Sequence, residues 1–335
     1  MENEKKLKFN PEDMSAAADA EFLLFMKEGK FKDLISTMPT LGRYSLRNQM
    51  LILMQNPNAT NVNRMRAWNY QKRSIVKGEN SIRIIKPTFA TQVSTDNKGN
   101  ITEKTLDKVT GYEVDYVYDV SQTKGEPLKD VFAEDSATDK YYDTVKGALM
   151  ESLKGYEFKT HEPSEDESYG VLDTLNKTIS TRSDLSKLDT LLVLIKQVAA
   201  ANVVMRDRRN FQGLSPSEMD NVRNVEMSAI AYTVAKRLNL EEQPLVVPDF
   251  TDMNDETIAK FADNVGVIRS VSQRMINTTE GAVGKLIYEQ EKAKAAESEI
   301  PEEGPTMSAT KGEIKPAKTA KKPRQMQKIK SEVAM

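Results

Sequence analysis

The stretch "TLLVLIKQVAAANVV", from Thr190 to Val204, has the composition of a buried helix. Apolar side chains cover nearly every side of such a helix, which is typical of a helix in a protein interior. Lys196 and Gln197 interrupt this apolar run near its middle. A charged group and an amide must reach water or a polar partner. The pair therefore marks either the rim of the buried surface, with Lys196 extended to water, or a functional site that uses the two polar side chains.

The chain has 335 residues, of which 39% are hydrophobic, a length that suits about two domains. We predict a flexible N-terminus (1–10), a first domain (11–130), a second domain (131–298) and a disordered tail (299–335), because the tail is rich in Pro, Lys and Glu. No cysteine is present, which excludes disulfides and Cys-ligated metals. The charged N-terminus and the lack of an apolar run near ~20 residues predict a soluble, cytoplasmic protein without a membrane partner.

The single histidine, His161, limits the chemistry open to this chain. Hydrolytic sites commonly use imidazole as a base or a metal ligand. His161 lies in "KTHEPSEDESYG", a polar and acidic stretch without apolar periodicity. We expect a solvated loop histidine without a catalytic role, and no cofactor or metal.

Charge is distributed unevenly along the chain, although the net charge is only −2. Between Leu41 and Ala90 the one acidic residue is Glu79. The cations of this segment are Arg43, Arg47, Arg64, Arg66, Lys72, Arg73, Lys77, Arg83 and Lys86. A basic first module followed by an acidic second half favours a nucleic-acid partner for the first module.

Hydrophobic periodicity predicts a mixed α+β fold, with strands in the first module and mostly helices in the second. In the first module we expect helices over 11–30 and 46–55 and strands over 81–93 and 111–120, with a turn at 97–100. In the second we expect a hairpin over 169–180 and helices over 137–153, 185–204, 224–240, 255–276 and 282–296.

Aromatic and amide side chains are interleaved with the cations of the first module, as in "RMRAWNYQKRSIVKGENSIRIIKP". Single-stranded nucleic acid is bound by such a mixture, because cations contact phosphates and aromatic rings stack on bases. Tyr44, Trp68 and Tyr70 are the candidates for stacking. The alternative is that Trp68 belongs to the core and that the charges form a solvated face.

Several motifs of the first module, in order, resemble the N-terminal single-stranded-DNA-binding domain of ArdC-type antirestriction proteins, which are similar to plasmid primase N-termini. The resemblance spans about 110 residues. The matching residues are Tyr44, Ser45, Asn48, Gln55, Pro57, Ala59, Thr60, Trp68, Lys77, Gly78, Glu79, Asp119, Ser121, Gln122, Thr123 and Gly125. The resemblance implies single-stranded DNA binding.

That family usually continues into a zincin-like domain with a His-Glu-x-x-His helix. Residues at i and i+4 share one helical face, which brings two imidazoles onto one zinc. Aligning the 190–204 stretch on this motif places Lys196 and Ala200 at the histidine positions, Gln197 at the catalytic Glu and Glu226 at the third ligand. These side chains cannot assemble a zinc site. We therefore expect no peptidase activity, and one hypothesis is that Lys196 replaces the metal charge and pairs with Glu226.

The sequence thus predicts a non-enzymatic single-stranded-DNA-binding protein of a plasmid, integrative element or phage, with a role in antirestriction or protection of incoming DNA. The predicted DNA-binding residues are Arg43, Tyr44, Asn48, Arg64, Arg66, Trp68, Lys72, Arg73 and Lys77. One alternative is a pseudo-peptidase that binds a protein partner, encoded by the host or the element, through the inactive groove. Another is a hydrolase with a site around His161.

Overall fold

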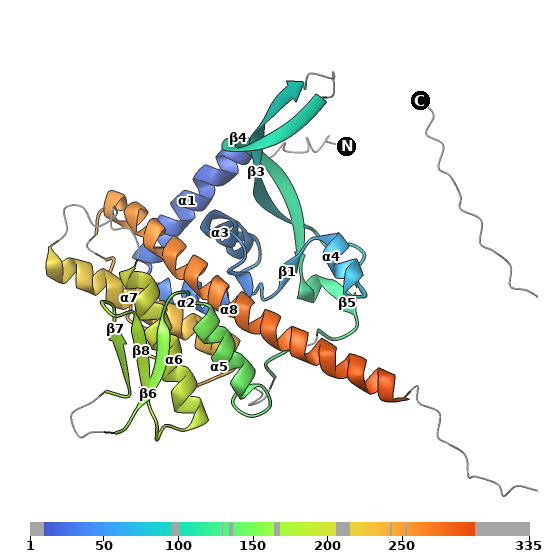
Figure 1. The fold of residues 1–335 in the computed structure, drawn as a ribbon. Helices are drawn as coiled ribbons and strands as arrows, with labels where there is room; N and C mark the ends of the chain where they lie inside the picture. Colours follow the sequence, from blue (N-terminus) through green and yellow to red (C-terminus); the bar gives the residue numbers. More distant parts are fainter. Residues whose placement is uncertain are drawn as a thin grey trace, which may run out of the picture. The chain divides into compact units, whose positions relative to one another are not determined.

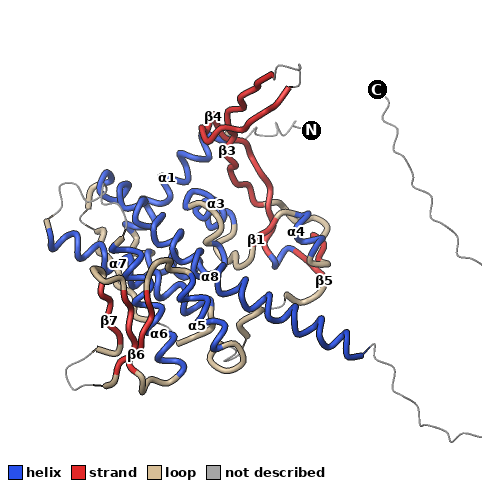
Figure 2. Tube along the Cα trace, in the orientation of Figure 1, coloured by secondary structure: helices blue, strands red, loops and turns tan. Residues whose placement is uncertain are grey.

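The computed structural model describes residues 10–95, 101–128, 130–133, 137–163, 168–205, 215–241, 243–251 and 253–298, with side chains except at 92–95, 101–107 and 296–298. The expected α+β fold is confirmed (Figures 1 and 2). The chain divides into two compact units, Met1–Glu289 and Gln290–Met335. The predicted N-terminal segment 1–9, the 97–100 turn and the 299–335 tail lie outside the described residues. Among the described helices, none combines the length and apolar character needed to cross a membrane.

Three helices begin the fold. Helix α1 (Pro11–Lys27) starts with the Asn10 side chain accepting a hydrogen bond from the Glu12 amide, and the chain turns at Gly29, whose φ is 70°. Helix α2 (Phe31–Leu41) was not predicted. Helix α3 (Leu46–Gln55) is capped by Ser45 and has the predicted bounds, because Pro57 disfavours a helical conformation at Asn56.

A long antiparallel hairpin packs beside these helices. Strands β3 (Ile82–Thr95) and β4 (Ile101–Asp119) pair with each other, and the end of β4 also pairs with the short β1 (Val62–Asn63), giving the order β1-β4-β3. β4 begins ten residues earlier than predicted, and β3 ends two residues later. Register shifts between Thr88 and Thr91 mark an irregularity midway along the hairpin.

A buried carboxylate, that of Asp119, joins the short elements at the base of the hairpin. It is 1% exposed and accepts hydrogen bonds from the amides of Thr60 and Asn61 and from the amide and hydroxyl of Ser121, at 2.8–3.0 Å. The residues after it form the 3₁₀ turn η1 (Val120–Gln122) and β5 (Thr123–Gly125), which pairs with β2 (Arg73–Ile75). Helix α4 (Met65–Tyr70) lies between β1 and β2 and was not predicted.

The second half begins with helix α5 (Tyr142–Glu151) and a three-stranded sheet. Strands β7 (Gly170–Asp173) and β8 (Thr178–Arg182) form the hairpin expected over 169–180. Strand β6 (Glu157–His161) runs parallel to β8 and was not predicted. His161 therefore ends a strand and is half-buried, which corrects its interpretation as a solvated loop residue. Its polar sequence pattern hid the strand, because none of its five side chains is fully buried and three are exposed, so no apolar alternation marks it.

Three long helices complete the fold, and two of them differ from expectation. Helix α6 (Lys187–Val204) contains the apolar stretch Thr190–Val204, with Ser186 as its N-cap. Helix α7 (Pro216–Arg237) starts eight residues earlier than predicted, because Ser215 and Glu218 form a capping box and Pro216 takes the first helical position. Helix α8 (Asp255–Ser298) is continuous and replaces the two helices predicted over 255–276 and 282–296.

One hydrophobic core runs through residues that were predicted to form separate domains. Helix α2 contacts α7, and the rings of Phe31, Phe250 and Phe261 cluster with centroids 4.9–6.3 Å apart. Phe31 belongs to α2 and Phe261 to α8. The boundary predicted between residues 130 and 131 thus lies inside the Met1–Glu289 unit.

Gly125 is predicted to be essential for stability, because it has a φ of 148° and lies directly against β2. A Cβ there would lie 2.8 Å from the Arg73 Cα and closer still to the Lys72 carbonyl oxygen. We expect Gly125→Ala to lower the free energy of unfolding in urea by at least about 2 kcal/mol. Gly147→Ala is the control: a Cβ on this α5 residue meets nothing within 4 Å, so a gain of about 0.5–1 kcal/mol is expected. Equal effects of the two substitutions would contradict this account.

Candidate nucleic-acid interface and peptidase-like groove

A groove of about 690 Å³ lies where α1, α3, the β3–β4 hairpin and α8 meet. Its lining combines cations with aromatic rings, as expected for a surface that contacts nucleic acid. The charged and aromatic residues of the lining are Arg43, Arg47, Arg64, Lys86, Asp19, Asp115, Asp263, Tyr44 and Tyr112. We call this the basic groove.

Arg43 and Tyr44 are positioned by the backbone of β1. The Tyr44 hydroxyl donates to the Val62 carbonyl at 2.8 Å, and the Arg43 guanidinium donates to the same oxygen. The guanidinium carbon lies 5.4 Å from the centre of the Tyr44 ring, within the range of a cation–π contact. Burial raises the pKa of the Tyr44 hydroxyl, which favours its neutral, donating form. A second depression of about 310 Å³ is also lined by Arg43, Tyr44 and Arg64.

Each of the other three cations of the basic groove is paired with a carboxylate. Arg47 donates to both carboxylate oxygens of Asp19, at 2.7 and 2.9 Å, and this contact raises the Arg47 pKa. Arg64 pairs with Asp115, and Lys86 pairs with Glu113 at 2.6 Å. Exposed pairs of this kind contribute about 0–1 kcal/mol. A phosphate can therefore replace the carboxylate at little cost.

Trp68 is wrongly predicted as a stacking residue. Its side chain is 0% exposed, and its indole N–H donates to the Tyr118 carbonyl at 2.9 Å. Because the indole is fully buried, a base cannot stack on it. Tyr70, at the end of the same helix, is 91% exposed and is available for stacking.

Asn48 lines the basic groove, but its amide is already occupied by strand β3. It donates to the Ile85 carbonyl at 2.8 Å and accepts from the Ile85 amide at 2.9 Å. Gln55 makes the same pair of bonds to Arg83, at 2.8 and 2.9 Å. These two α3 amides clamp the helix to β3, so the motif residues at these positions support the groove.

The remaining predicted cations lie outside the basic groove. Arg66 and Lys77 are exposed but do not line it. Lys72 pairs with Glu126 at 3.2 Å, and Arg73 donates to the side chain and carbonyl of Thr123. Arg47, Lys86 and Tyr112 line the groove instead. Arg47 and Lys86 were counted among the cations of residues 41–90, but they were not predicted to bind DNA. Their position in the groove depends on how the hairpin packs against α3.

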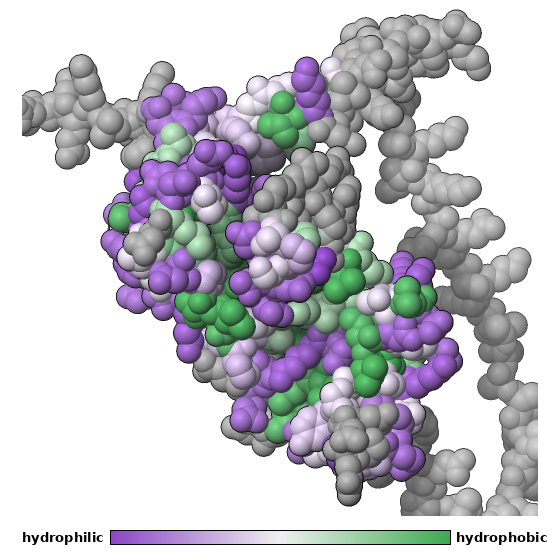
Figure 3. Space-filling view, turned by 90° about the vertical axis from the view of Figure 1, so that its left-hand side faces the viewer, coloured by the Kyte–Doolittle hydropathy of each residue, from purple (hydrophilic) through white to green (hydrophobic). Residues whose placement is uncertain are grey.

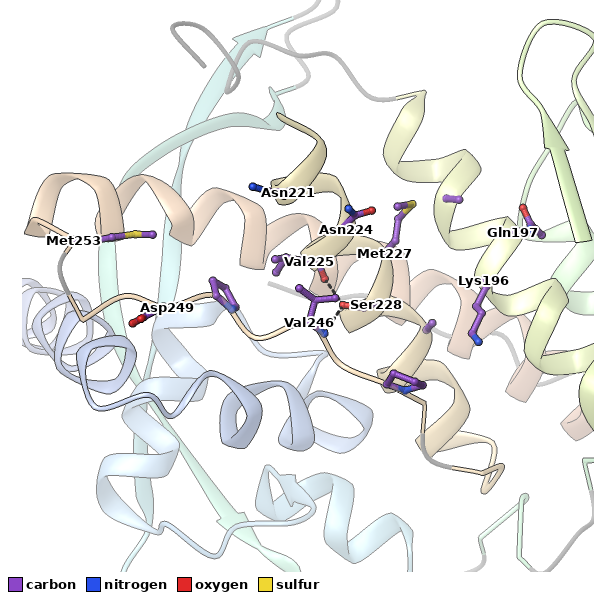
Figure 4. Close-up of a pocket in the computed structure, with 14 residues that line it drawn as sticks. Lys196, Gln197, Asn221, Asn224, Val225, Met227, Ser228, Val246, Asp249 and Met253 are labelled. Carbon is purple, nitrogen blue, oxygen red and sulfur yellow. Dashed lines mark hydrogen bonds between the residues drawn. The ribbon is translucent and has the colours of Figure 1, made fainter. Parts of the chain in front are cut away.

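A second groove, of about 720 Å³, lies between α6, α7 and the segment 244–253 (Figure 4). Lys196, Gln197 and Ala200 all line it, so the structure brings together the three positions aligned with His-Glu-x-x-His. The Ser228 hydroxyl fixes the opposite wall by accepting from the Val246 amide at 3.0 Å. We call this second groove the α6–α7 groove. Figure 3 shows apolar patches among hydrophilic residues on one side of the molecule.

Lys196 and Gln197 have different environments. Lys196 is exposed, as expected for a side chain that extends to water. The Gln197 amide donates to the Gly170 carbonyl at 3.1 Å and ties α6 to the edge of β7. The approach is so close that a Cβ at Gly170 would overlap the Val193 side chain and lie 3.3 Å from the Gln197 amide.

The expected ion pair between Lys196 and Glu226 is not among those that the described residues form. Glu226 is 3% exposed and accepts a hydrogen bond from Asn264 of α8 at 3.0 Å. Glu226 is not among the α7 residues that line the groove, although its neighbours Val225 and Met227 are. Glu226 and Lys196 therefore do not meet in this groove.

The residues of the α6–α7 groove do not fit a metal. An ammonium, an amide and a methyl group are a poor ligand set, since zinc is bound by His, Cys or carboxylate groups. Within the ranges that the structure describes, no three His, Cys, Asp or Glu residues are arranged to hold an ion.

No protein-family model and no curated protein matches the sequence. Among solved structures, the chain is similar to the antirestriction protein ArdC of plasmid R388 in its metal-free form, with 15% identity, coverage of 72% of this chain and 86% of that one, and a TM-score of 0.36. The Mn(II)-bound form of ArdC gives 12% identity, 78% and 98% coverage and a TM-score of 0.35. Both TM-scores are below 0.5, so the likeness alone assigns neither a family nor a site.

The burial of Trp68 predicts its fluorescence, because it is the single tryptophan of the chain. We expect iodide to quench its emission weakly, both in the free protein and with a single-stranded oligonucleotide bound. Emission that is strongly quenched in the free protein and shielded by the oligonucleotide would instead show that Trp68 stacks on bases.

Proposed function

We propose that this chain is a non-enzymatic single-stranded-DNA-binding protein whose basic groove contacts the phosphates and bases of the strand. The observation that carries the proposal is the convergence of Arg43, Arg47, Arg64 and Lys86 on one groove beside Tyr44. These residues come from the α2–α3 turn, α3, the chain before α4 and strand β3. Only the folded chain brings them together.

The chemistry of the groove suits an unpaired strand. Guanidinium groups bind phosphate oxygens in a planar, two-point geometry. An aromatic ring beside them can stack on a base at about 1–3 kcal/mol, which requires a base that is not already stacked in a duplex. Tyr44 is held by its hydroxyl and by Arg43, so its ring is pre-oriented for such a contact.

Two further aspects of the proposal rest on sequence and chemistry. The side chains of the α6–α7 groove support a role without catalysis, since Lys196, Gln197 and Ala200 supply neither metal ligands nor a general base at the positions where a zincin needs them. The motif resemblance supports a cytoplasmic role in antirestriction, or in protection of incoming DNA, for a plasmid, integrative element or phage.

Salt dependence tests the basic groove directly. If about four phosphates of a single strand are neutralised, the log–log slope of affinity against salt is about −3. The double variant Arg43→Gln/Arg64→Gln removes two of these contacts, so we expect a slope near −1.5 and weaker binding of a labelled single-stranded oligonucleotide, measured by fluorescence anisotropy.

The control for this experiment is Lys140→Gln/Lys159→Gln, which removes the same charge from residues that do not line the groove. It should retain a slope near that of the native chain. The full chain is used, because the residues up to Gly125 share their core with α7 and α8. A native slope near zero, or equal losses in the two double variants, would contradict the proposal.

A second candidate function is supported by the lining of the α6–α7 groove, where Val225, Met227, Val246 and Met253 surround a hollow that also holds Lys196 and Asn224. Apolar walls with a few polar groups are typical of a site for a peptide or small ligand. We propose that this groove binds a segment of a protein partner.

Asn224→Arg tests this candidate, because Asn224 is exposed and an arginine there fills the groove without disturbing the core. A partner recovered with the full native chain should be lost with Asn224→Arg. The same partner should be retained by Arg43→Gln/Arg64→Gln. If both variants lose the partner, its recovery depends on DNA binding by the basic groove, and this result would contradict a separate peptide site.

A further inference from the structure

Helix α8 carries a polar face that continues beyond the basic groove. Ala262 and Asp263 line the groove, and a shallow depression of about 480 Å³ follows along the same helix. The depression is lined by Arg269, Ser270, Gln273, Arg274, Asn277 and Thr278. Residues spaced by three and four positions share one side of a helix, so these side chains form one face. From Asp263 to Asn277 this face is about 21 Å long.

The two guanidiniums of this face have no carboxylate partner among the described residues. Arg269 donates to the Gly42 carbonyl at 3.3 Å, and Arg274 donates to the Asn202 side chain. Nearby acids of the helix are Asp263, at the groove, and Glu280, which pairs with Arg237. The basic groove differs, since three carboxylates line it beside its four cations. The α8 face therefore has more unneutralised positive charge.

Arg269 is also partly desolvated, and burial lowers its pKa. A half-buried cation that contacts only a carbonyl loses hydration without gaining an opposite charge. An anion bound beside it would restore that interaction. Phosphate is the anion best matched to two guanidiniums with amide and hydroxyl groups around them.

Gly42 connects this face to the basic groove. Its carbonyl receives Arg269, and a Cβ at Gly42 would lie 2.8 Å from the Gln273 side-chain oxygen. The next residue in the chain, Arg43, lines the basic groove. The α2–α3 turn therefore contacts residues that line the depression on α8 and also supplies residues that line the groove.

We propose that the α8 face from Arg269 to Asn277 is a second phosphate-binding segment, along which a single strand held in the basic groove continues. This inference rests on the proposed function. Arg269 and Arg274 would bind phosphate oxygens, and Gln273 and Asn277 would donate from their amides. Strands long enough to leave the groove would gain contacts that short strands lack.

The test compares a short oligothymidine of about six nucleotides with a long one of about 20, within and beyond the ~4–16 nucleotides that one single-strand-binding OB fold covers. In the full chain, Arg269→Gln/Arg274→Gln should weaken binding of the long strand about tenfold and reduce its salt slope by about 1.4. Binding of the short strand should change less than about twofold. Arg274 is exposed, so Arg274→Gln alone should fold normally even if the double variant does not. This single variant should weaken binding of the long strand by an intermediate amount. Lys260→Gln, on the same helix but outside the depression, is the charge-matched control for Arg274→Gln and should bind like the native chain.

Unchanged binding of the long strand by both α8 variants, with Arg43→Gln/Arg64→Gln still weakened, would overturn this inference alone. Equal losses for short and long strands would also overturn it, because they would show an effect transmitted through Gly42 to the groove. A native chain that binds neither strand would overturn the proposed function together with this extension.

Discussion

The carboxylate of Asp119 is the contact on which the basic groove depends. It is almost fully buried, and such a group is stable only when its oxygens are satisfied. Four hydrogen bonds satisfy them and fix the chain at Thr60 and Asn61, just before β1. Val62 then pairs with Asp119, and its carbonyl holds both Tyr44 and Arg43. The ring and guanidinium that face the groove are thus oriented by a residue that never contacts it. The α3 amide clamps to β3 hold the neighbouring wall in the same way.

This dependence explains how far the sequence could predict the site. Charge counting drew attention to the cations of residues 41–90, four of which line the basic groove, and periodicity located α1, α3, α6 and the β7–β8 hairpin. Motif residues such as Trp68 and Asn48 were assigned to DNA because polar and aromatic groups have the same signature whether they bind a ligand or support the fold. The groove lining also depends on long-range packing, which placed Lys86 of β3 and Asp263 of α8 together. Local pattern alone could not bring them together. The contact of Glu226 with Asn264 of α8 is likewise a long-range packing contact, which local pattern does not predict.

Lys196 and Gln197 now have separate explanations. Gln197 ties α6 to the β7 backbone, an arrangement that requires glycine at position 170. Lys196 lies at the rim of the α6–α7 groove and reaches solvent, so the apolar helix tolerates the pair because neither side chain is buried without a partner. The side chains of this groove offer apolar and polar contacts and no set of metal ligands. They support the proposal of a binding protein, for which the basic groove around Arg43 is the proposed DNA site.

The central claim is that the basic groove binds unpaired DNA through phosphate and base contacts. A titration of the full chain with a single-stranded oligonucleotide and with its duplex, each at two salt concentrations, tests it most directly. The account predicts tighter binding of the single strand at both concentrations, because the Tyr44 ring needs an unstacked base, and an affinity that falls steeply with salt because phosphate contacts release counterions. Equal affinity for single strand and duplex, or an affinity that does not change with salt, would contradict it.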